Sequence, residues 1–272
     1  MKTISVGTKK GGVGKTTMLF NIAGVLAETH RVLIVDVDPQ CNLTSACGLD
    51  KSDLKRRSSR DIFLEQEEIA PGELVVKNSI PQLPNLDLIP CHELMTAMEF
   101  FLVNQPARET ILRNYIHEHR EFFDQYDYVM FDTNPSLGII NQNAFAASDS
   151  IFMVTDVGED GINGAEDILK YWGVVQRALR LEPNVKALII NKADSRTKLS
   201  KEFVEFCQED ELLGRLLVEP VIPTQIIFPD ARMEHQPVNV VQFKDYRKRN
   251  SAAEASAQIK ALVAALREKE VF

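Results

Sequence analysis

Apolar runs rich in β-branched residues alternate along this chain with stretches of helical pattern. This alternation is typical of a parallel sheet that is covered by helices on both faces. We predict seven strands, at residues 3–7, 31–37, 86–90, 126–132, 150–156, 185–191 and 216–223. The pattern therefore predicts an α/β fold with one doubly wound, mostly parallel sheet, formed by a single domain over residues 1–272.

Three other segments complete the predicted fold. Residues 16–28 should form the helix that follows the first strand. Residues 251–269 should form a C-terminal helix, because their alanines and lysines favour helical structure. Residues 51–80 are highly charged and only weakly periodic, so we expect a surface excursion there and not a second domain.

Composition and charge narrow the classes of function. With 272 residues, of which 44% are hydrophobic, the chain can bury a full core. The formal net charge of -8 should repel nucleic acid, so any DNA binding must depend on a local basic patch. The four cysteines form no C-x-x-C pair, which favours reduced thiols in the cytoplasm. No run approaches the roughly eighteen apolar residues of a membrane span, so we expect neither export nor membrane insertion.

The first motif with chemical meaning is KKGGVGKTT at residues 9–17, directly after the first predicted strand. Its glycines allow backbone torsions that are closed to other residues, and they bring N–H groups close to a polyphosphate. Lys15 would reach the β- and γ-phosphates, and the hydroxyl of Thr16 would be a ligand of Mg²⁺. The predicted nucleotide-binding residues of this loop are Lys10, Gly11, Gly12, Val13, Gly14, Lys15, Thr16 and Thr17.

Acidic residues stand at the ends of two other predicted strands. The stretch VLIVDVDPQCN at 32–42 contains Asp36 and Asp38, and YDYVMFDTNPSLG at 126–138 contains Asp132. In open parallel sheets, ligands bind at the carboxyl ends of the strands, so these carboxylates can approach the glycine-rich loop. A hydrophobic strand that ends in an acid is the arrangement that engages Mg²⁺ through water, and Asp132 fits it.

These motifs resemble those of the ParA/MinD family of ATPases. The stretch KGGVGKTT at 10–17 resembles the deviant Walker A motif of these P-loop NTPases, and DVDPQ at 36–40 resembles their switch I element. The resemblance implies that Lys10 reaches across a two-fold interface to the phosphates in the partner subunit. Delivered in trans, this ammonium does the work of an arginine finger, which makes hydrolysis depend on dimerisation. Lys9, which breaks the strict phosphate-loop pattern, has no implied role, and we expect a solvated charge.

The same resemblance implies the remaining roles at the site. Asp38 would position or deprotonate the attacking water, and Asp36 would lie near the metal. Asn191 and Pro223 would contact the adenine base. The implied cofactors are ATP and Mg²⁺, the implied catalytic residues are Lys10, Lys15 and Asp38, and the implied metal residues are Thr16, Asp36 and Asp132. One departure concerns Asn134-Pro135, since the family usually has two prolines at this position.

A GTPase is the alternative nucleotide assignment. The stretch NKAD at 191–194 matches the N-K-x-D motif with which GTPases read guanine. GTPases also have D-x-x-G after the strand that carries the metal-binding acid, whereas Pro135 occupies the glycine position here. ATP is therefore the favoured nucleotide.

Within the family, the sequence favours the ParA branch. No cysteine pair is spaced to hold an iron–sulfur cluster. The apolar face of residues 251–269 is mostly Ala, Leu and Val, which favours packing on the domain over membrane binding. The resemblance implies a homodimer with ATP, nonspecific DNA binding over the nucleoid, and slow hydrolysis stimulated by a ParB-like centromere-binding protein during plasmid or chromosome partition. The alternative is a MinD-like or cargo-positioning ATPase that acts on a protein partner or a membrane surface.

Two basic segments are candidates for the DNA surface. Thr224 and Ile227 stand where small ParA proteins often carry arginines, so other cations must compensate. The segments at 195–201 and 243–249 could supply phosphate contacts that double across a dimer. The candidate DNA-binding residues are Arg196, Lys198, Lys201, Lys244, Arg247, Lys248 and Arg249.

Overall fold

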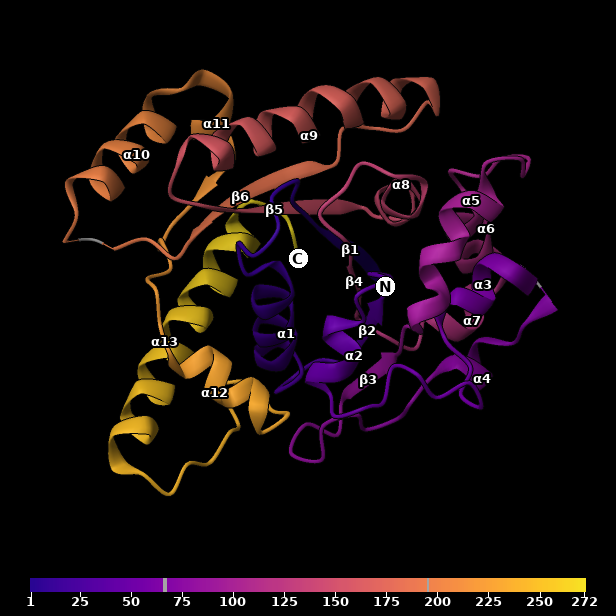
Figure 1. The fold of residues 1–272 in the computed structure, drawn as a ribbon, viewed down its shortest axis with the longest axis horizontal. Coiled ribbons are helices and arrows are strands. Elements are labelled where there is room, and N and C mark those ends of the chain that lie inside the picture. Colours follow the sequence, from indigo (N-terminus) through magenta and orange to yellow (C-terminus); the bar gives the residue numbers. More distant parts are fainter. Residues whose placement is uncertain (66–67, 195) are drawn as a thin grey trace.

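The computed structural model describes residues 1–65, 68–194 and 196–272. Within these ranges, seven strands form one sheet of order β3-β2-β4-β1-β5-β6-β7, in which every neighbouring pair is parallel (Figure 1). The strands are β1 (Lys2–Gly7), β2 (Val32–Asp36), β3 (Leu86–Ile89), β4 (Tyr128–Asp132), β5 (Ser150–Asp156), β6 (Val185–Asn191) and β7 (Leu217–Val218). The predicted α/β class and parallel sheet are thus confirmed.

Strand β7 is much shorter than the predicted strand at 216–223. It pairs with β6 only at Leu217 and Val218. Pro220 and Pro223 follow within a few residues, and proline cannot donate a hydrogen bond to a strand ladder. The regular ladder therefore ends at Val218, and the chain contacts β6 again only at Ile222, whose N–H donates to the Ile190 carbonyl, at 2.9 Å.

Helices cover both faces of the sheet (Figure 1). The side chains of β2 point alternately to the two faces of the sheet. Val32 and Ile34 belong to the core cluster around α1 and α13, whereas Leu33 and Val35 belong to the cluster on the other face. The helices are α1 (Lys15–Leu26), α2 (Asn42–Ala46), α3 (Ser59–Glu65), α4 (Pro71–Leu74), a 3₁₀ helix (Glu93–Ala97), α5 (Met98–Leu102), α6 (Ile111–Glu118), α7 (Arg120–Phe123), α8 (Ile139–Ala146), α9 (Glu159–Ala178), α10 (Lys198–Glu209), α11 (Glu211–Leu216), α12 (Ile227–Met233) and α13 (Tyr246–Glu268).

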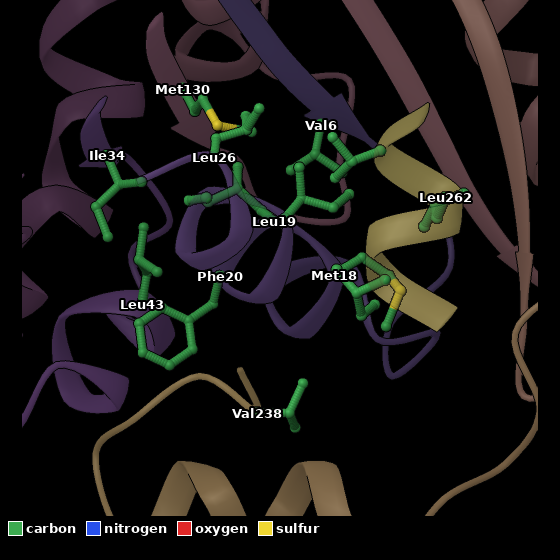
Figure 2. Packing of buried hydrophobic residues seen from close by; sticks show 14 of the residues in the cluster. Val6, Met18, Leu19, Phe20, Leu26, Ile34, Leu43, Met130, Val238 and Leu262 are labelled. Carbon is green, nitrogen blue, oxygen red and sulfur yellow. The ribbon is translucent and has the colours of Figure 1, made fainter. Parts of the chain in front are cut away.

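Helix α1 lies at the centre of the largest core cluster. Figure 2 shows its Leu19 and Leu26 together with Val6 and Met130 of the sheet and Leu262 of α13. All five side chains are almost completely buried. Because α1 begins where the glycine-rich loop ends, this packing fixes the helix N-terminus that faces the predicted nucleotide site.

Helix α13 begins at Tyr246, five residues before the predicted start at 251. The side chain of Asp245 accepts a hydrogen bond from the backbone N–H of Lys248, at 2.9 Å, and so caps the helix N-terminus. Further along, Ile259, Leu262 and Leu266 are buried in the cluster that contains α1. The apolar face of this helix is therefore occupied by packing on the domain. No helix of the described residues is both long and apolar enough to span a bilayer.

The segment 51–80 is more deeply integrated than the expected surface excursion. Ile62 and Phe63 of α3 and Leu74 of α4 are buried against the second face of the sheet, so this expectation was wrong for the helical parts of the segment. The few apolar side chains are separated by charged ones, which weakens the periodic signal. Residues 66 and 67 of the segment lie outside the described residues.

Candidate functional site

A cavity of about 670 Å³ opens at the carboxyl ends of the strands, within the size range of small-molecule sites. Its wall is formed by the glycine-rich loop and the start of α1, by the chain after β2, and by the segments that follow β6 and β7. Every predicted nucleotide-binding residue lines it: Lys10, Gly11, Gly12, Val13, Gly14, Lys15, Thr16, Thr17, Asn191 and Pro223. Residues from distant parts of the chain thus meet at the carboxyl ends of the strands, where ligands bind in open α/β folds.

The shape of the glycine-rich loop depends on Gly14. This residue has φ of 93° and precedes the first turn of α1, so it occupies a conformation that L-residues rarely adopt. A Cβ atom at Gly14 would lie 2.2 Å from Nδ2 of Asn191. That amide nitrogen donates a hydrogen bond to the Val13 carbonyl, at 2.7 Å. Asn191 therefore holds the loop at the mouth of the predicted base site.

We expect Gly14→Ala to lower the free energy of unfolding by about 1–3 kcal/mol, because it places a side chain in left-handed backbone and displaces Asn191. Equilibrium urea denaturation of the nucleotide-free protein measures this loss. Gly11→Ala is the matched control, since the nearest atom to a Cβ at Gly11 is Cγ of Pro135, 4.0 Å away. Equal destabilisation of the two variants would contradict the assigned role of Gly14.

Lys15 and Thr16 line the cavity, and both contact Asp132, which does not line it. The Lys15 ammonium lies 2.8 Å from Oδ1 of Asp132 and donates a further hydrogen bond to the Thr133 carbonyl. The Thr16 hydroxyl donates to Oδ2 of the same carboxylate, at 2.7 Å. Asp132 is completely buried, and a buried carboxylate is tolerated only when it is paired and hydrogen-bonded in this way.

This donor set fits Mg²⁺. A hydroxyl and a carboxylate are the hard oxygen ligands that Mg²⁺ prefers, and both stand beside a lysine that can bind phosphate. The described residues contain no group of three or more His, Cys, Asp or Glu side chains that could enclose a metal ion. Thr16 and Asp132 supply two protein oxygens, and Mg²⁺ is usually held by one or two such oxygens together with substrate phosphates and water.

Asp38 is a second acid close to the same lysine. Its Oδ2 is 4.0 Å from the Lys15 ammonium, and its Oδ1 accepts a hydrogen bond from the Gln40 N–H, at 2.8 Å. Burial raises the pKa of the Asp38 carboxyl, although the Lys15 charge opposes this effect. Unlike Asp132, Asp38 lines the cavity, so its free oxygen can face a bound substrate.

Asp36 occupies a different environment from the other predicted metal residues. Its carboxylate accepts hydrogen bonds from the N–H and the hydroxyl of Thr44, both at 2.8 Å, and from the Asp38 N–H, at 3.1 Å. Burial, together with the neighbouring Asp132 charge, raises the pKa of Asp36 to about 7. Asp36 does not line the cavity. The geometry therefore gives it a supporting position between switch I and α2, behind the oxygens that fit Mg²⁺.

Both lysines that open the loop contact acids of the same chain. Lys10 Nζ lies 2.9 Å from Oδ1 of Asp156, the last residue of β5. Lys9 forms an ion pair with Asp167 in α9. The Lys9 side chain is 47% exposed, as expected for a solvated charge, and its ion pair also joins it to α9.

The end of the cavity near β6 favours the adenine assignment over the guanine one. Asp194, which would read guanine, does not line the cavity. Both of its oxygens are engaged by the Arg196 guanidinium, at 2.9 and 2.8 Å, and this pairing lowers the pKa of Asp194 to about 2. Asn191 and Pro223 do line the cavity.

The cavity is also lined by residues to which the sequence assigned no role, among them Gln40, Asn42, Lys192 and Arg232. Arg232 of α12 donates to the Asn42 side-chain oxygen, at 3.0 Å, and so joins the segment after β7 to the start of α2. Lys192 donates to the Gly12 carbonyl. The first three follow predicted motif residues within a few positions, a signal that could have identified them, whereas no motif marks Arg232.

The two basic segments differ in which of their cations form ion pairs with acids of the same chain. Arg196 pairs with Asp194 and Lys198 pairs with Glu202, each at 2.8 Å, while Ser195 lies outside the described residues. At the start of α13, Lys248 pairs with Asp230 at 2.8 Å. Three exposed cations of this second segment have no carboxylate partner among the described residues: Lys244, Arg247 and Arg249.

Comparisons with known proteins agree with this geometry. A family model described as an AAA domain matches residues 1–187. The sporulation initiation inhibitor protein Soj of Bacillus subtilis is 29% identical over 238 residues, which are 87% of this chain and 90% of Soj. The chromosome partitioning protein ParA of Myxococcus xanthus is 28% identical over 250 residues, which are 89% of this chain and 82% of that protein. A solved Cyanothece McdA variant in complex with ATP has the same fold, with a TM-score of 0.83 at 18% identity over 98% of this chain and 96% of McdA.

Proposed function

The chain belongs to the ParA/MinD family of ATPases, and from this premise we propose that it is an ATP-dependent dimerisation switch that binds DNA nonspecifically during plasmid or chromosome partition. The observation that carries the proposal is that Lys15 and Thr16, which line a nucleotide-sized cavity, both contact the buried carboxylate of Asp132. This arrangement combines a phosphate-binding ammonium with oxygens that fit Mg²⁺.

The chain's own side chains divide the work of phosphoryl transfer. Lys15 would exchange its contact with Asp132 for phosphate oxygens when ATP binds, and Thr16 and Asp132 would hold Mg²⁺. When bound, Mg²⁺ supplies positive charge against the developing charge on the phosphates. Asp38, which lies close to Lys15, orients the attacking water. Lys10 of the partner subunit completes the charge on the γ-phosphate, so turnover is slow until a ParB-like adaptor favours the active dimer.

The DNA surface of this proposal is the basic cluster at the start of α13, defined by Lys244, Arg247 and Arg249. Cations are unfavourable at a helix N-terminus, because the helix dipole is already positive there, so their placement calls for a function such as phosphate binding. The alternative segment at 196–201 is largely neutralised by its own acids. Lys248 contributes less, because Asp230 holds it.

We expect Arg247→Glu combined with Arg249→Glu to weaken DNA binding about 100-fold at low salt, because a dimer would lose four phosphate contacts. The binding constant should also depend less steeply on salt, so that the slope of its logarithm against the logarithm of the salt concentration decreases in magnitude by about three to four units. Fluorescence anisotropy with a labelled duplex of arbitrary sequence measures both quantities. The matched control is Arg196→Glu with Lys198→Glu, for which we expect only a small loss. Unchanged affinity of the first variant would remove this cluster as the DNA surface.

Co-sedimentation with DNA tests the proposed function as a whole. The protein should pellet with DNA in ATP and Mg²⁺, and it should remain in the supernatant with ADP or without nucleotide, because only the dimer doubles the basic clusters. Failure to bind DNA with ATP would favour the second candidate, a cargo-positioning ATPase that acts on a protein partner. Two observations favour that candidate, the net charge of -8 and the absence of arginine at Thr224 and Ile227. A membrane-bound version is disfavoured, because the apolar face of α13 is buried in the core.

A further inference from the structure

The β5–α9 region lies directly against the two lysines at the start of the glycine-rich loop. Lys10 contacts Asp156 at the end of β5, and Lys9 contacts Asp167 in α9. Between these acids, Gly164 of α9 is so close that a Cβ atom there would lie 3.6 Å from Cβ of Lys9 and 3.8 Å from the backbone nitrogen of Lys10. The region therefore supports the loop segment from which Lys10 must reach a partner subunit.

Asp156 is held firmly in its position. Strand β5 lies between β1 and β6, and Asp156 is paired in register with Asn191 of β6. The turn that follows is tight, since a Cβ at Gly161 would lie 2.4 Å from the Asp156 carbonyl oxygen. The side chains of Lys10 and Asp156 are only 32% and 22% exposed, so their ion pair is partly shielded from water. Such a pair is stronger than a fully exposed one, which contributes little.

We propose that Asp156 is a positioning residue that retains Lys10 in its own subunit until an ATP-bound partner arrives. The proposal rests on the trans-acting role of Lys10 in the proposed function. One ammonium cannot contact Asp156 at 2.9 Å and also reach the phosphates of the other subunit. Dimerisation must therefore break the Lys10–Asp156 pair, which raises the concentration of protein needed to form the dimer. When the dimer separates, the pair forms again, and the trans-acting lysine of the free subunit is held by Asp156.

The neighbouring Lys9–Asp167 pair supplies a matched control. It joins the adjacent lysine to the same region, and its side chains are more exposed, at 47% and 44%. Neither residue lines the cavity, so Asp167→Asn removes the same charge from the same surface without freeing Lys10. A general loosening of the loop or a change of net charge would affect both variants alike.

Sedimentation velocity with a non-hydrolysable ATP analogue and Mg²⁺ tests the proposal. We expect Asp156→Asn to lower the dissociation constant of the dimer about tenfold, which is the combined effect of removing one partly buried ion pair from each of the two subunits. Asp167→Asn should change the dissociation constant less than about twofold. Asp156→Glu, which keeps the acid, should restore much of the wild-type value. A gain in dimerisation cannot result from simple damage to the fold.

A second measurement tests whether Asp156 affects dimerisation through Lys10. The double variant Lys10→Ala, Asp156→Asn should have the same dimerisation constant as Lys10→Ala alone, because Asp156 acts only through that lysine. If the wild-type protein dimerises while Asp156→Asn matches it or dimerises less well, the positioning role is overturned and the proposed function stands. If the wild-type protein remains monomeric with the analogue, both are overturned.

Discussion

Lys15→Ala should abolish tight ATP binding, whereas Lys10→Ala should leave it measurable. Lys15 lies in the buried floor of the cavity, within reach of Asp132 and Asp38, and we propose that it binds the phosphates of its own subunit. Loss of such a desolvated charge should weaken binding at least about 100-fold, or about 2.7 kcal/mol. Lys10 contacts Asp156 instead and is proposed to serve the partner, so its loss should change monomer affinity less than about threefold. Isothermal titration calorimetry with Mg²⁺ and a non-hydrolysable ATP analogue measures both.

The comparison of Lys15→Ala with Lys10→Ala needs two controls. Lys9→Ala removes the adjacent positive charge, which pairs with Asp167 outside the cavity, and should bind the analogue as the wild type does. Lys15→Ala also leaves the buried Asp132 carboxylate without its ammonium, a change that can destabilise the fold, so far-UV circular dichroism must confirm that the variant is folded. An equal loss of affinity in Lys10→Ala and Lys15→Ala would remove the case for a trans-acting lysine.

The sheet was predictable because its strands are buried on both faces and therefore stand out as continuous apolar runs. Strand ends were harder. In the run at 216–223 the ladder with β6 ends at Val218, and the chain contacts β6 again at Ile222, whose N–H donates to the Ile190 carbonyl, at 2.9 Å. Only the prolines mark this interruption. The start of α13 depends on the cap at Asp245, a single hydrogen bond that adds five residues to the helix. In both cases the boundary depends on local hydrogen-bond partners of the backbone, and a hydrophobic pattern does not reveal these.

The site was predictable to the extent that its residues stand in short motifs at strand ends. The cavity contains the whole glycine-rich loop and Asp38, which the motifs identified. The motifs did not show that Asp36 points to Thr44 and that only Asp38 reaches the cavity, because this depends on where β2 ends and the chain turns. The contacts of Asp156 and Arg232 join segments more than a hundred residues apart, so only the folded chain brings them to the site.

The last expected result concerns Asp38→Ala, which should form a dimer with ATP and fail to hydrolyse it. The carboxylate is assigned to water activation, and its Oδ2 is 4.0 Å from the Lys15 ammonium, a weaker contact than the one between Lys15 and Asp132. Loss of a residue that positions or deprotonates the nucleophile should lower kcat about 10²–10⁴-fold. Phosphate-release assays measure the loss of turnover, and sedimentation velocity at saturating ATP measures the dimer.

Asp38→Asn is the informative companion variant. An asparagine oxygen can still accept the Gln40 N–H, which Oδ1 of Asp38 accepts at 2.8 Å, so switch I should keep its shape. The amide cannot act as a base, and it carries no charge with which to orient a water molecule beside Lys15. Asp38→Asn should therefore dimerise with ATP as the wild-type protein does, while its turnover should be as low as that of Asp38→Ala. If both variants remain monomeric at saturating ATP, Asp38 supports the ATP-bound dimer itself, and its assignment to water activation is wrong.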